Sequence, residues 1–358
     1  PLTLAVADVR PKLMANRGNV VKGFRPSFRF FFFAMAFLLW GADALSQAVI
    51  RTNASGNWSN AATWVVVSGT DADGIPDADD DVIIRGAAVV TVDVNSFANS
   101  VQVGGTNGFP LNGSGVLTFA AGGVTLSVTG GVTVGGFNNT VRNGTINFVS
   151  GANLVASSLT FGNPGPTPST NNTIDMTAGG TLTVGSLTVN TAGGIVNNWT
   201  AGTGTVVLNA TNTLPTVVLT NFNNLTINGG TTTLGASLTA ITGTLAVSSG
   251  TLNLSTFNIA SASAVSLTGT TISGTGTLTL AGDVATNASA STAQITAPIA
   301  LNGAVRTFNI AAGAATPDLL ISSVVSGAGS WGLQKAGSGE LSLSGNNTSA
   351  CGTSLAAG

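Results

Sequence analysis

The sequence lacks histidine and tyrosine altogether, has one cysteine, Cys351, and carries only 11 basic and 13 acidic side chains in 358 residues. Without histidine, His-based catalytic triads and mixed Cys/His zinc sites are excluded. A single cysteine can form neither an intramolecular disulfide nor a thiolate cluster. The net charge of −2 provides no electrostatic footprint for nucleic acid, so we expect no nucleic-acid partner.

The chain is rich in apolar residues and in glycine. Hydrophobic residues make up 43% of it, and there are 48 glycines. This apolar content is enough to bury a core, which excludes a disordered linker.

The amino-terminal region has the pattern of an export signal. Residues 1–29 contain six basic side chains and one acidic side chain, and the apolar run FFFFAMAFLLWGA follows at 30–42. A run of this length is short for a membrane-spanning helix and typical of the apolar part of a signal peptide. We therefore predict that residues 1–48 are a basic leader plus signal peptide, with an uncleaved membrane-anchoring start as the alternative. The mature protein is then expected to be secreted, either on a bacterial cell surface or in the extracellular space.

Beyond the leader, the sequence predicts short strands separated by tight turns. Segments such as GVLTFAAG (115–122), GTLTVGSLTV (180–189) and GTLNLS (250–255) alternate apolar residues with Thr or Ser and are bounded by Gly or Asn. Most steps between the leading apolar residues of 225–280 are six or seven residues, and three such strands would make a repeat of about 20 residues. The leading apolar residues are Leu225, Leu234, Leu238, Leu245, Leu252, Ile259, Val265, Ile272 and Leu278.

This spacing favours a coil over a sandwich. In a parallel coil every strand pairs with its counterpart one turn above and below, so that only the two ends expose sheet edges. We predict an all-β fold, a right-handed parallel β-helix (β-solenoid) with an N-terminal capping segment in which Trp58 and Trp64 pack into the core. The alternative is an array of β-sandwiches.

Two segments resemble known bacterial surface proteins. GNWSNAATW (56–64), followed by DDVIIRGAAVVTVD (80–93), resembles the opening segment of large bacterial surface β-solenoids, and residues 222–259 look like their body repeats. The end of the chain, WGLQKAGSGELSLSGNNTSACGTSLAAG (331–358), is similar to the autotransporter-associated β-strand repeat, and departs from it at Glu340 and at Ala350 and Cys351. The matching positions are Gly332, Leu333, Lys335, Gly337, Gly339, Leu341, Leu343, Ser344, Gly345, Asn347 and Thr348.

These resemblances imply a β-helix passenger exported by an autotransporter or type IX-like route. They also imply a division of the mature region into an N-terminal cap with the first rungs (49–105), a solenoid body (106–330) and a truncated repeat (331–358). Because the last repeat is incomplete, we expect the sequence to belong to a longer protein, and membrane contact is expected only through the signal peptide or through a C-terminal anchor.

The predicted function is that of a non-enzymatic structural or adhesive element: a stalk, an adhesin or part of a fibre. Self-association through the solenoid ends is expected, and the surface glycan or protein that the chain contacts is not specified by the sequence. From residue 94 onward there are seven charged side chains, and they are far apart in the sequence. They are Arg142, Asp175, Asp283, Arg306, Asp318, Lys335 and Glu340.

Two alternatives remain open. A carbohydrate-active β-helix enzyme would need a pair of carboxylates, and the four late acidic residues form no local pair, so no catalytic residue is assigned. An ice-binding solenoid is suggested by Thr-x-Thr pairs such as Thr181/Thr183, Thr231/Thr233 and Thr277/Thr279, although exposed strand positions also favour threonine without such a role.

One candidate ligand site stands out, in the segment TDADGIPDADDD (70–81). It concentrates acidic residues in a chain that otherwise avoids charge, and its Asp-x-Asp-Gly start is similar to calcium loops. No cofactor is required by this interpretation, and calcium is the one candidate; a solvated acidic loop is the alternative. The candidate ligands are Asp71, Asp73, Asp77, Asp79 and Asp80.

Overall fold

The computed structural model describes residues 47–105, 113–136, 142–163, 170–327, 332–349 and 352–356. The chain divides into two units, Pro1–Leu45 and Ser46–Gly358, and all described residues belong to the second. The predicted leader, apart from its last two residues, therefore lies outside the described residues, as do Trp331 and Cys351.

The described residues are almost entirely β-structure. They form one sheet of 25 strands and one of six strands, with two short 3-10 helices, η1 (Ala61–Thr63) and η2 (Ala192–Gly194), and no α-helix. The smaller sheet contains β2 (Gly56–Asn57), β5 (Val89–Val92), β8 (Gly115–Phe119), β10 (Gly144–Asn147), β12 (Asn171–Asp175) and β14 (Val196–Thr200). The larger sheet contains β1 (Val49–Thr52), β3 (Trp64–Ser68), β4 (Asp81–Ile84), β6 (Ser96–Ala98), β7 (Ser100–Val103), β9 (Thr125–Val134), β11 (Asn153–Phe161), β13 (Thr181–Val189), β15 (Thr205–Leu208), β16 (Asn212–Leu214), β17 (Asn221–Phe222), β18 (Asn224–Leu234), β19 (Ala240–Asn253), β20 (Ile259–Leu267), β21 (Thr271–Ser273), β22 (Leu278–Leu280), β23 (Val284–Thr286), β24 (Ala293–Ile295), β25 (Ile299–Ala300), β26 (Arg306–Ile310), β27 (Leu319–Ile321), β28 (Val325–Ser326), β29 (Leu333–Ala336), β30 (Leu341–Leu343) and β31 (Thr353–Leu355).

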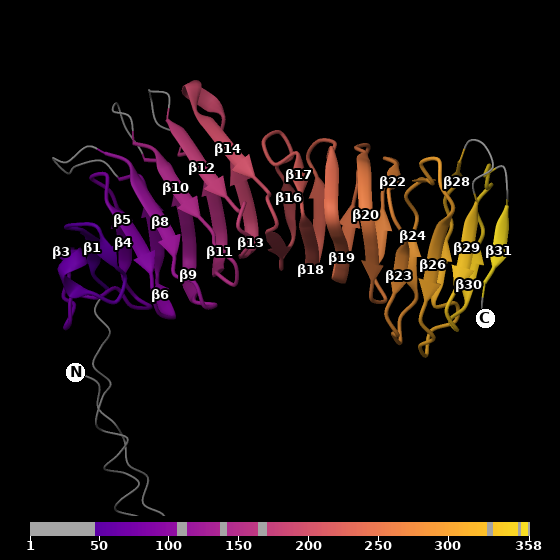
Figure 1. The fold of residues 1–358 in the computed structure, drawn as a ribbon, viewed down its shortest axis with the longest axis horizontal. Helices are drawn as coiled ribbons and strands as arrows, with labels where there is room; N and C mark the ends of the chain where they lie inside the picture. The colour runs from indigo at the N-terminus through magenta and orange to yellow at the C-terminus, as the bar shows by residue number, and fades with distance from the viewer. Residues whose placement is uncertain are drawn as a thin grey trace, which may run out of the picture. The chain divides into compact units, whose positions relative to one another are not determined.

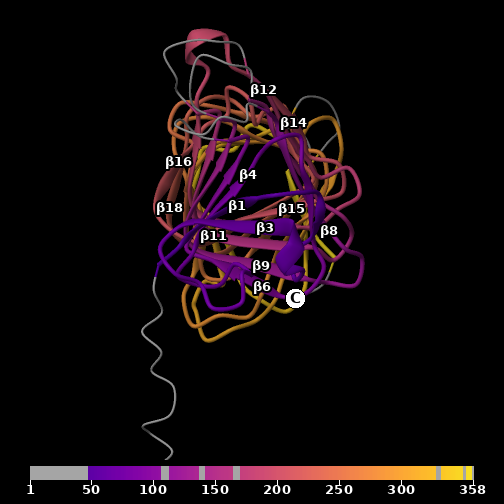
Figure 2. The ribbon, with the colours of Figure 1, turned by 90° about the vertical axis from the view of Figure 1, so that its left-hand side faces the viewer.

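Strand pairing in these sheets is mostly parallel and follows the chain from one turn to the next. Strands that pair lie about one turn apart in the sequence, as the order from indigo to yellow shows in Figure 1. In Figure 2, seen from the side of β1 and β3, successive turns lie behind one another. Parallel pairing between strands this far apart is compatible with a β-solenoid and differs from the hairpin-linked pairing of a sandwich.

A continuous inward ladder forms the core. Each of its residues pairs with the next, none is more than 1% exposed, and all of them are aliphatic or aromatic. We call it the first ladder: Leu126, Leu154, Leu182, Val206, Leu225, Leu245, Val265, Val284 and Phe308. Because side chains alternate between the two faces of a strand, the intervening Thr, Ser and Asn residues face outward.

Two further ladders complete each turn in the region from which the repeat was predicted. The second ladder contains Leu252 paired with Ile272, and the third contains Ile259 paired with Leu278. The predicted three strands per turn are therefore confirmed here. The first ladder advances by 20, 20 and 19 residues from Leu225 to Val284, whereas the step from Leu126 to Leu154 is 28 residues because the turns are longer there.

The amino-terminal strands depart from this regularity. Strand β1 pairs in parallel with β4 on one side and antiparallel with β3 on the other, and this is the one antiparallel pair among the described strands. The rings of Trp58 and Trp64 lie beside this pair at right-angled geometry, with centroids 5.1 Å apart and exposures of 1% and 5%. The prediction that both tryptophans are core residues is confirmed.

Candidate functional site

The aspartate-rich segment forms the connection between β3 and β4. Its two ends are fixed to the folded body: the indole N–H of Trp58 donates to the carbonyl oxygen of Pro76 at 3.3 Å, and Asp80 is only 2% exposed. Both carboxylate oxygens of Asp80 accept backbone N–H groups, from Ala48 at 3.1 Å and from Asp77 at 2.9 Å. Asp80 therefore has a structural role in closing the loop against β1.

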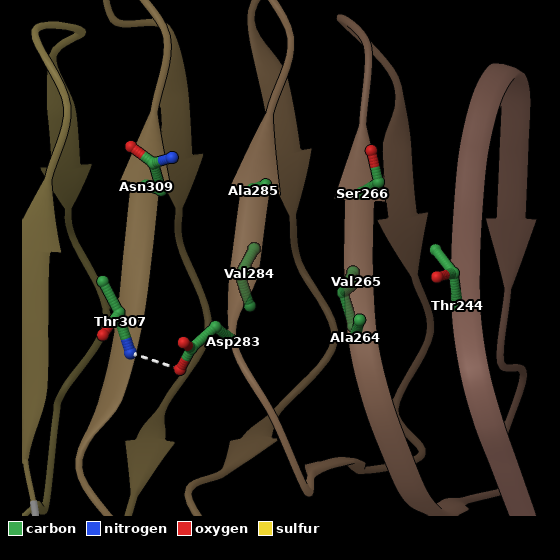
Figure 3. Close-up of a pocket in the computed structure, with 9 residues that line it drawn as sticks. All are labelled: Thr244, Ala264, Val265, Ser266, Asp283, Val284, Ala285, Thr307 and Asn309. Carbon is green, nitrogen blue, oxygen red and sulfur yellow. Dashed lines mark hydrogen bonds between the residues drawn. The ribbon is translucent and has the colours of Figure 1, made fainter.

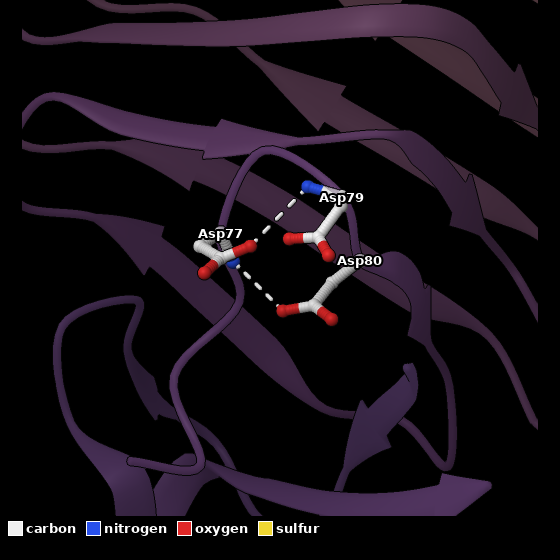
Figure 4. A group of neighbouring side chains, drawn as sticks. All are labelled: Asp77, Asp79 and Asp80. Atoms are coloured by element: carbon white, nitrogen blue, oxygen red, sulfur yellow. Dashed lines mark hydrogen bonds between the residues drawn. The ribbon is translucent and has the colours of Figure 1, made fainter. Parts of the chain in front are cut away.

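Three of the five predicted ligands come together. Carboxylate oxygens of Asp77, Asp79 and Asp80 all lie within 4.8 Å of one another, and Figure 4 shows the three side chains around the same turn. The backbone N–H of Asp79 also donates to Asp77 Oδ1 at 3.2 Å. We call Asp77, Asp79 and Asp80 the aspartate triad.

The triad does not include the other two predicted ligands. Asp71 accepts the backbone N–H of Asp73 at 3.3 Å, and Asp73 accepts that of Ile75 at 2.9 Å. Each of these carboxylates thus stabilises its own tight turn, which is a common use of aspartate in loops. The Asp-x-Asp-Gly similarity that suggested the calcium loop therefore falls on residues outside the triad.

Mutual repulsion raises the proton affinity of the triad. The pKa of Asp79 is raised to about 6, first by a hydrogen bond between its carboxyl group and that of Asp77, and then by desolvation and the negative charge of Asp77. Burial raises the pKa of Asp80, although the N–H groups of Asp77 and Ala48 oppose this shift. At neutral pH the triad thus concentrates negative charge that a cation would offset.

The triad has the spacing that a calcium ion needs but supplies only part of its ligands. Ca²⁺–oxygen distances of about 2.3–2.6 Å place two oxygens on opposite sides of an ion about 5 Å apart, close to the spacing of the triad. The Oδ2 atom of Asp79 is buried and has no hydrogen-bond partner among the described residues, which leaves it available to a cation. Because Asp80 already accepts two N–H groups, water would have to provide much of the 6–8-fold coordination.

The late acidic residues serve mainly as backbone acceptors. Asp318 and Glu340 do become neighbours on successive turns, where Asp318 accepts the N–H of Gly313 at 2.7 Å and that of Glu340 at 2.8 Å. Asp175 accepts from Thr177, two residues further on. Both oxygens of Asp318 are thus engaged in holding turns.

The Thr-x-Thr pairs do not share one surface. Thr181 and Thr183 flank the first ladder, and Thr231 pairs with Thr251 beside the second. Thr279 pairs with Ala300 beside the third ladder. The three pairs therefore lie on three sides of the coil and do not form the single threonine array that ice binding would require.

A shallow cavity that the sequence did not predict lies beside the first ladder. It has a volume of about 300 Å³ and spans four neighbouring strands, β19, β20, β23 and β26 (Figure 3). Its lining residues are Thr244, Ala264, Val265, Ser266, Asp283, Val284, Ala285, Thr307 and Asn309. They come from positions up to 65 residues apart, and only the register between turns brings them together.

Comparison with known proteins finds no matching family model, no similar curated protein and no similar solved structure. Among the described residues, no helix is long and apolar enough to cross a membrane.

Proposed function

We propose that this chain is an exported, non-enzymatic β-solenoid that serves as a structural or adhesive element at a bacterial cell surface or in the extracellular space. The observation that carries the proposal is the first ladder, in which nine successive inward residues pair in register. Continuous backbone hydrogen bonding and a dry core make a durable support for ligand contacts. The outward positions are uncharged almost throughout, so they suit contact with surfaces rather than solution chemistry.

The proposed architecture is a right-handed parallel β-helix closed at its amino-terminal end by a cap. The cap consists of η1 and β3 with the Trp58–Trp64 pair. Its support is the antiparallel pairing of β3 with β1, because β3 occupies the edge of β1 that would otherwise be open to another strand. The resemblance of residues 331–358 to the autotransporter-associated repeat supports an autotransporter or type IX-like route and self-association through solenoid ends.

Calcium is the cofactor that we propose for the aspartate triad, in the role of a clamp that stabilises the β3–β4 loop. It would neutralise the repulsion between Asp77 and Asp79 and occupy the buried Oδ2 atom of Asp79. This role concerns stability and involves no reaction.

Export and adhesion can be tested together. Mass spectrometry of material recovered outside the cell should find a new amino terminus near Leu45 or Val49, and an intact Pro1 end on exported protein would contradict the signal peptide. Beads coated with the exported chain should be retained on cells or matrix more strongly than beads coated with a soluble protein of equal net charge. Equal retention of the two kinds of bead would contradict an adhesive role.

A further inference from the structure

The shallow cavity beside the first ladder is created by the choice of outward residues on four turns. Ala264 pairs with Thr244, and Ala285 pairs with both Ser266 and Asn309. The two alanines are low points between taller neighbours, because a methyl group rises less from the sheet than the side chains of Thr, Asp or Asn. The result is an apolar floor with a polar rim (Figure 3).

The rim is held in a fixed arrangement. The backbone N–H of Thr307 donates to Asp283 Oδ1 at 2.8 Å, and the N–H of Val265 donates to the carbonyl oxygen of Asp283 at 3.0 Å. Asp283 is exposed and is the one charged residue among those that line the cavity. Its carboxylate is thus oriented by one neighbouring turn while it remains accessible to a ligand.

The chemistry of the cavity excludes several kinds of ligand. Strand β20 pairs with β19 and β23, and β23 pairs with β20 and β26, so no free strand edge is present here for a peptide to extend. A phosphate or another anion would be repelled by the carboxylate of Asp283. Recognition must therefore use side chains, and it must suit a neutral or cationic ligand.

A neutral sugar matches both parts of the cavity. Its hydroxyl groups are donors and acceptors at once, as are the hydroxyls of Thr244, Ser266 and Thr307 and the amide of Asn309. The carboxylate of Asp283 accepts only, and hydrogen bonds to charged groups are stronger than those between neutral groups. The apolar C–H face of a pyranose ring can rest on the methyl groups of Ala264 and Ala285.

We infer that the cavity lined by Asp283, Thr307 and Asn309 over Ala264 and Ala285 is a binding subsite for one residue of a neutral glycan. The inference rests on the proposed adhesive function and names the ligand class for it. The volume lies at the low end of ligand pockets, which suits a single ring of a longer chain. A ligand of this size binds on the order of millimolar by itself, so adhesion would use many copies.

The test uses the full chain and a printed array of neutral oligosaccharides, followed by titration of a soluble oligosaccharide that binds. Ala285→Trp fills the cavity and should weaken binding at least tenfold. Asp283→Asn removes the charge while it keeps an oxygen that can accept the Thr307 N–H, and should weaken binding by about tenfold. The matched control is Ala260→Trp, an exposed alanine of β20 that does not line the cavity, and it should bind as the unchanged chain does.

The outcomes separate this subsite from the proposed function. No binding to any neutral glycan, or equal binding by Ala285→Trp and the unchanged chain, overturns the subsite, while retention of coated beads would still support adhesion. Loss of binding in Ala260→Trp as well, with unchanged thermal unfolding, also overturns it. If polyamines such as spermine bind and Asp283→Asn abolishes that binding while sugars do not bind, the cavity is a cation site and the glycan inference is wrong.

Discussion

The carboxyl groups of Asp77 and Asp79 share a hydrogen bond, and this bond is the first cause that raises the pKa of Asp79 to about 6. A hydrogen bond between two carboxyl groups requires one of them to be protonated. The folded chain therefore binds a proton at Asp79 more tightly than an unfolded chain, in which aspartate has a pKa of about 3.9.

Replacement of Asp79 by asparagine should stabilise the protein at neutral pH in the absence of calcium. A group with a raised folded-state pKa contributes stability that is fully present below pH 4 and is lost as the pH rises through about 6. The asparagine amide can donate to Asp77 at every pH, so Asp79→Asn should raise the unfolding temperature at pH 7 and leave it unchanged near pH 3.5. Thermal unfolding across this pH range checks it, with Asp175→Asn as a control for general charge effects. A variant that melts at the same temperature as the parent at pH 7 would contradict the shared proton.

Calcium should stabilise the unchanged chain, and more so above pH 6. A site with a dissociation constant of about 1 mM would add about 1.4 kcal/mol at 10 mM Ca²⁺. Protons compete for the same oxygens, so the stabilisation should fall as the pH drops below about 6. Differential scanning calorimetry with Ca²⁺ and with Mg²⁺ measures it.

Variants can localise the calcium effect to the triad. Asp77→Asn should remove it, whereas Asp73→Asn, outside the triad, should retain it. If Asp77→Asn and Asp73→Asn respond to calcium alike, the ion is not bound at the triad.

Neighbouring residues of one strand should differ sharply in their contribution to stability. Leu225 is buried in the first ladder between Val206 and Leu245, whereas Thr226 faces outward from the same strand. Leu225→Ala should therefore cost about 2–5 kcal/mol, and Thr226→Ala less than about 1 kcal/mol. Urea unfolding gives both values, and comparable losses in the two variants would contradict the inward and outward assignment.

The inward ladders could be predicted from the sequence because they depend on a local property. The recurrence of apolar residues from Leu225 to Leu278 specifies which side chains face the core in each strand, and every leading residue there is buried. The alternation within strands and the placement of Trp58 and Trp64 follow in the same way from residue type.

The candidate sites could be predicted only in part, because they depend on loops and on register. The aspartate segment was visible as charge, yet local backbone N–H groups engage Asp71 and Asp73 in their own turns and separate them from the triad. The cavity around Asp283 was not predicted, because loops of unequal length set which outward residues become neighbours on successive turns. The same irregularity placed Thr181, Thr231 and Thr279 on different sides of the coil.

Glycine at one turn should be indispensable because two rungs approach closely there. A Cβ atom at Gly282 would lie 1.6 Å from the carbonyl oxygen of Ser263 on the preceding turn, and backbone of this kind cannot move aside without breaking the neighbouring pairs. At Gly327, by contrast, a Cβ atom would meet only the side chain of Leu301, at 3.4 Å. Gly282→Ala should thus destabilise the protein by more than about 2 kcal/mol, whereas Gly327→Ala should cost less than about 1 kcal/mol. Urea unfolding compares them, and hydrogen exchange should locate the loss at β20 and β23, the strands joined beside Gly282. If Gly282→Ala is tolerated as well as Gly327→Ala, the turns are not packed as closely as the ladder requires.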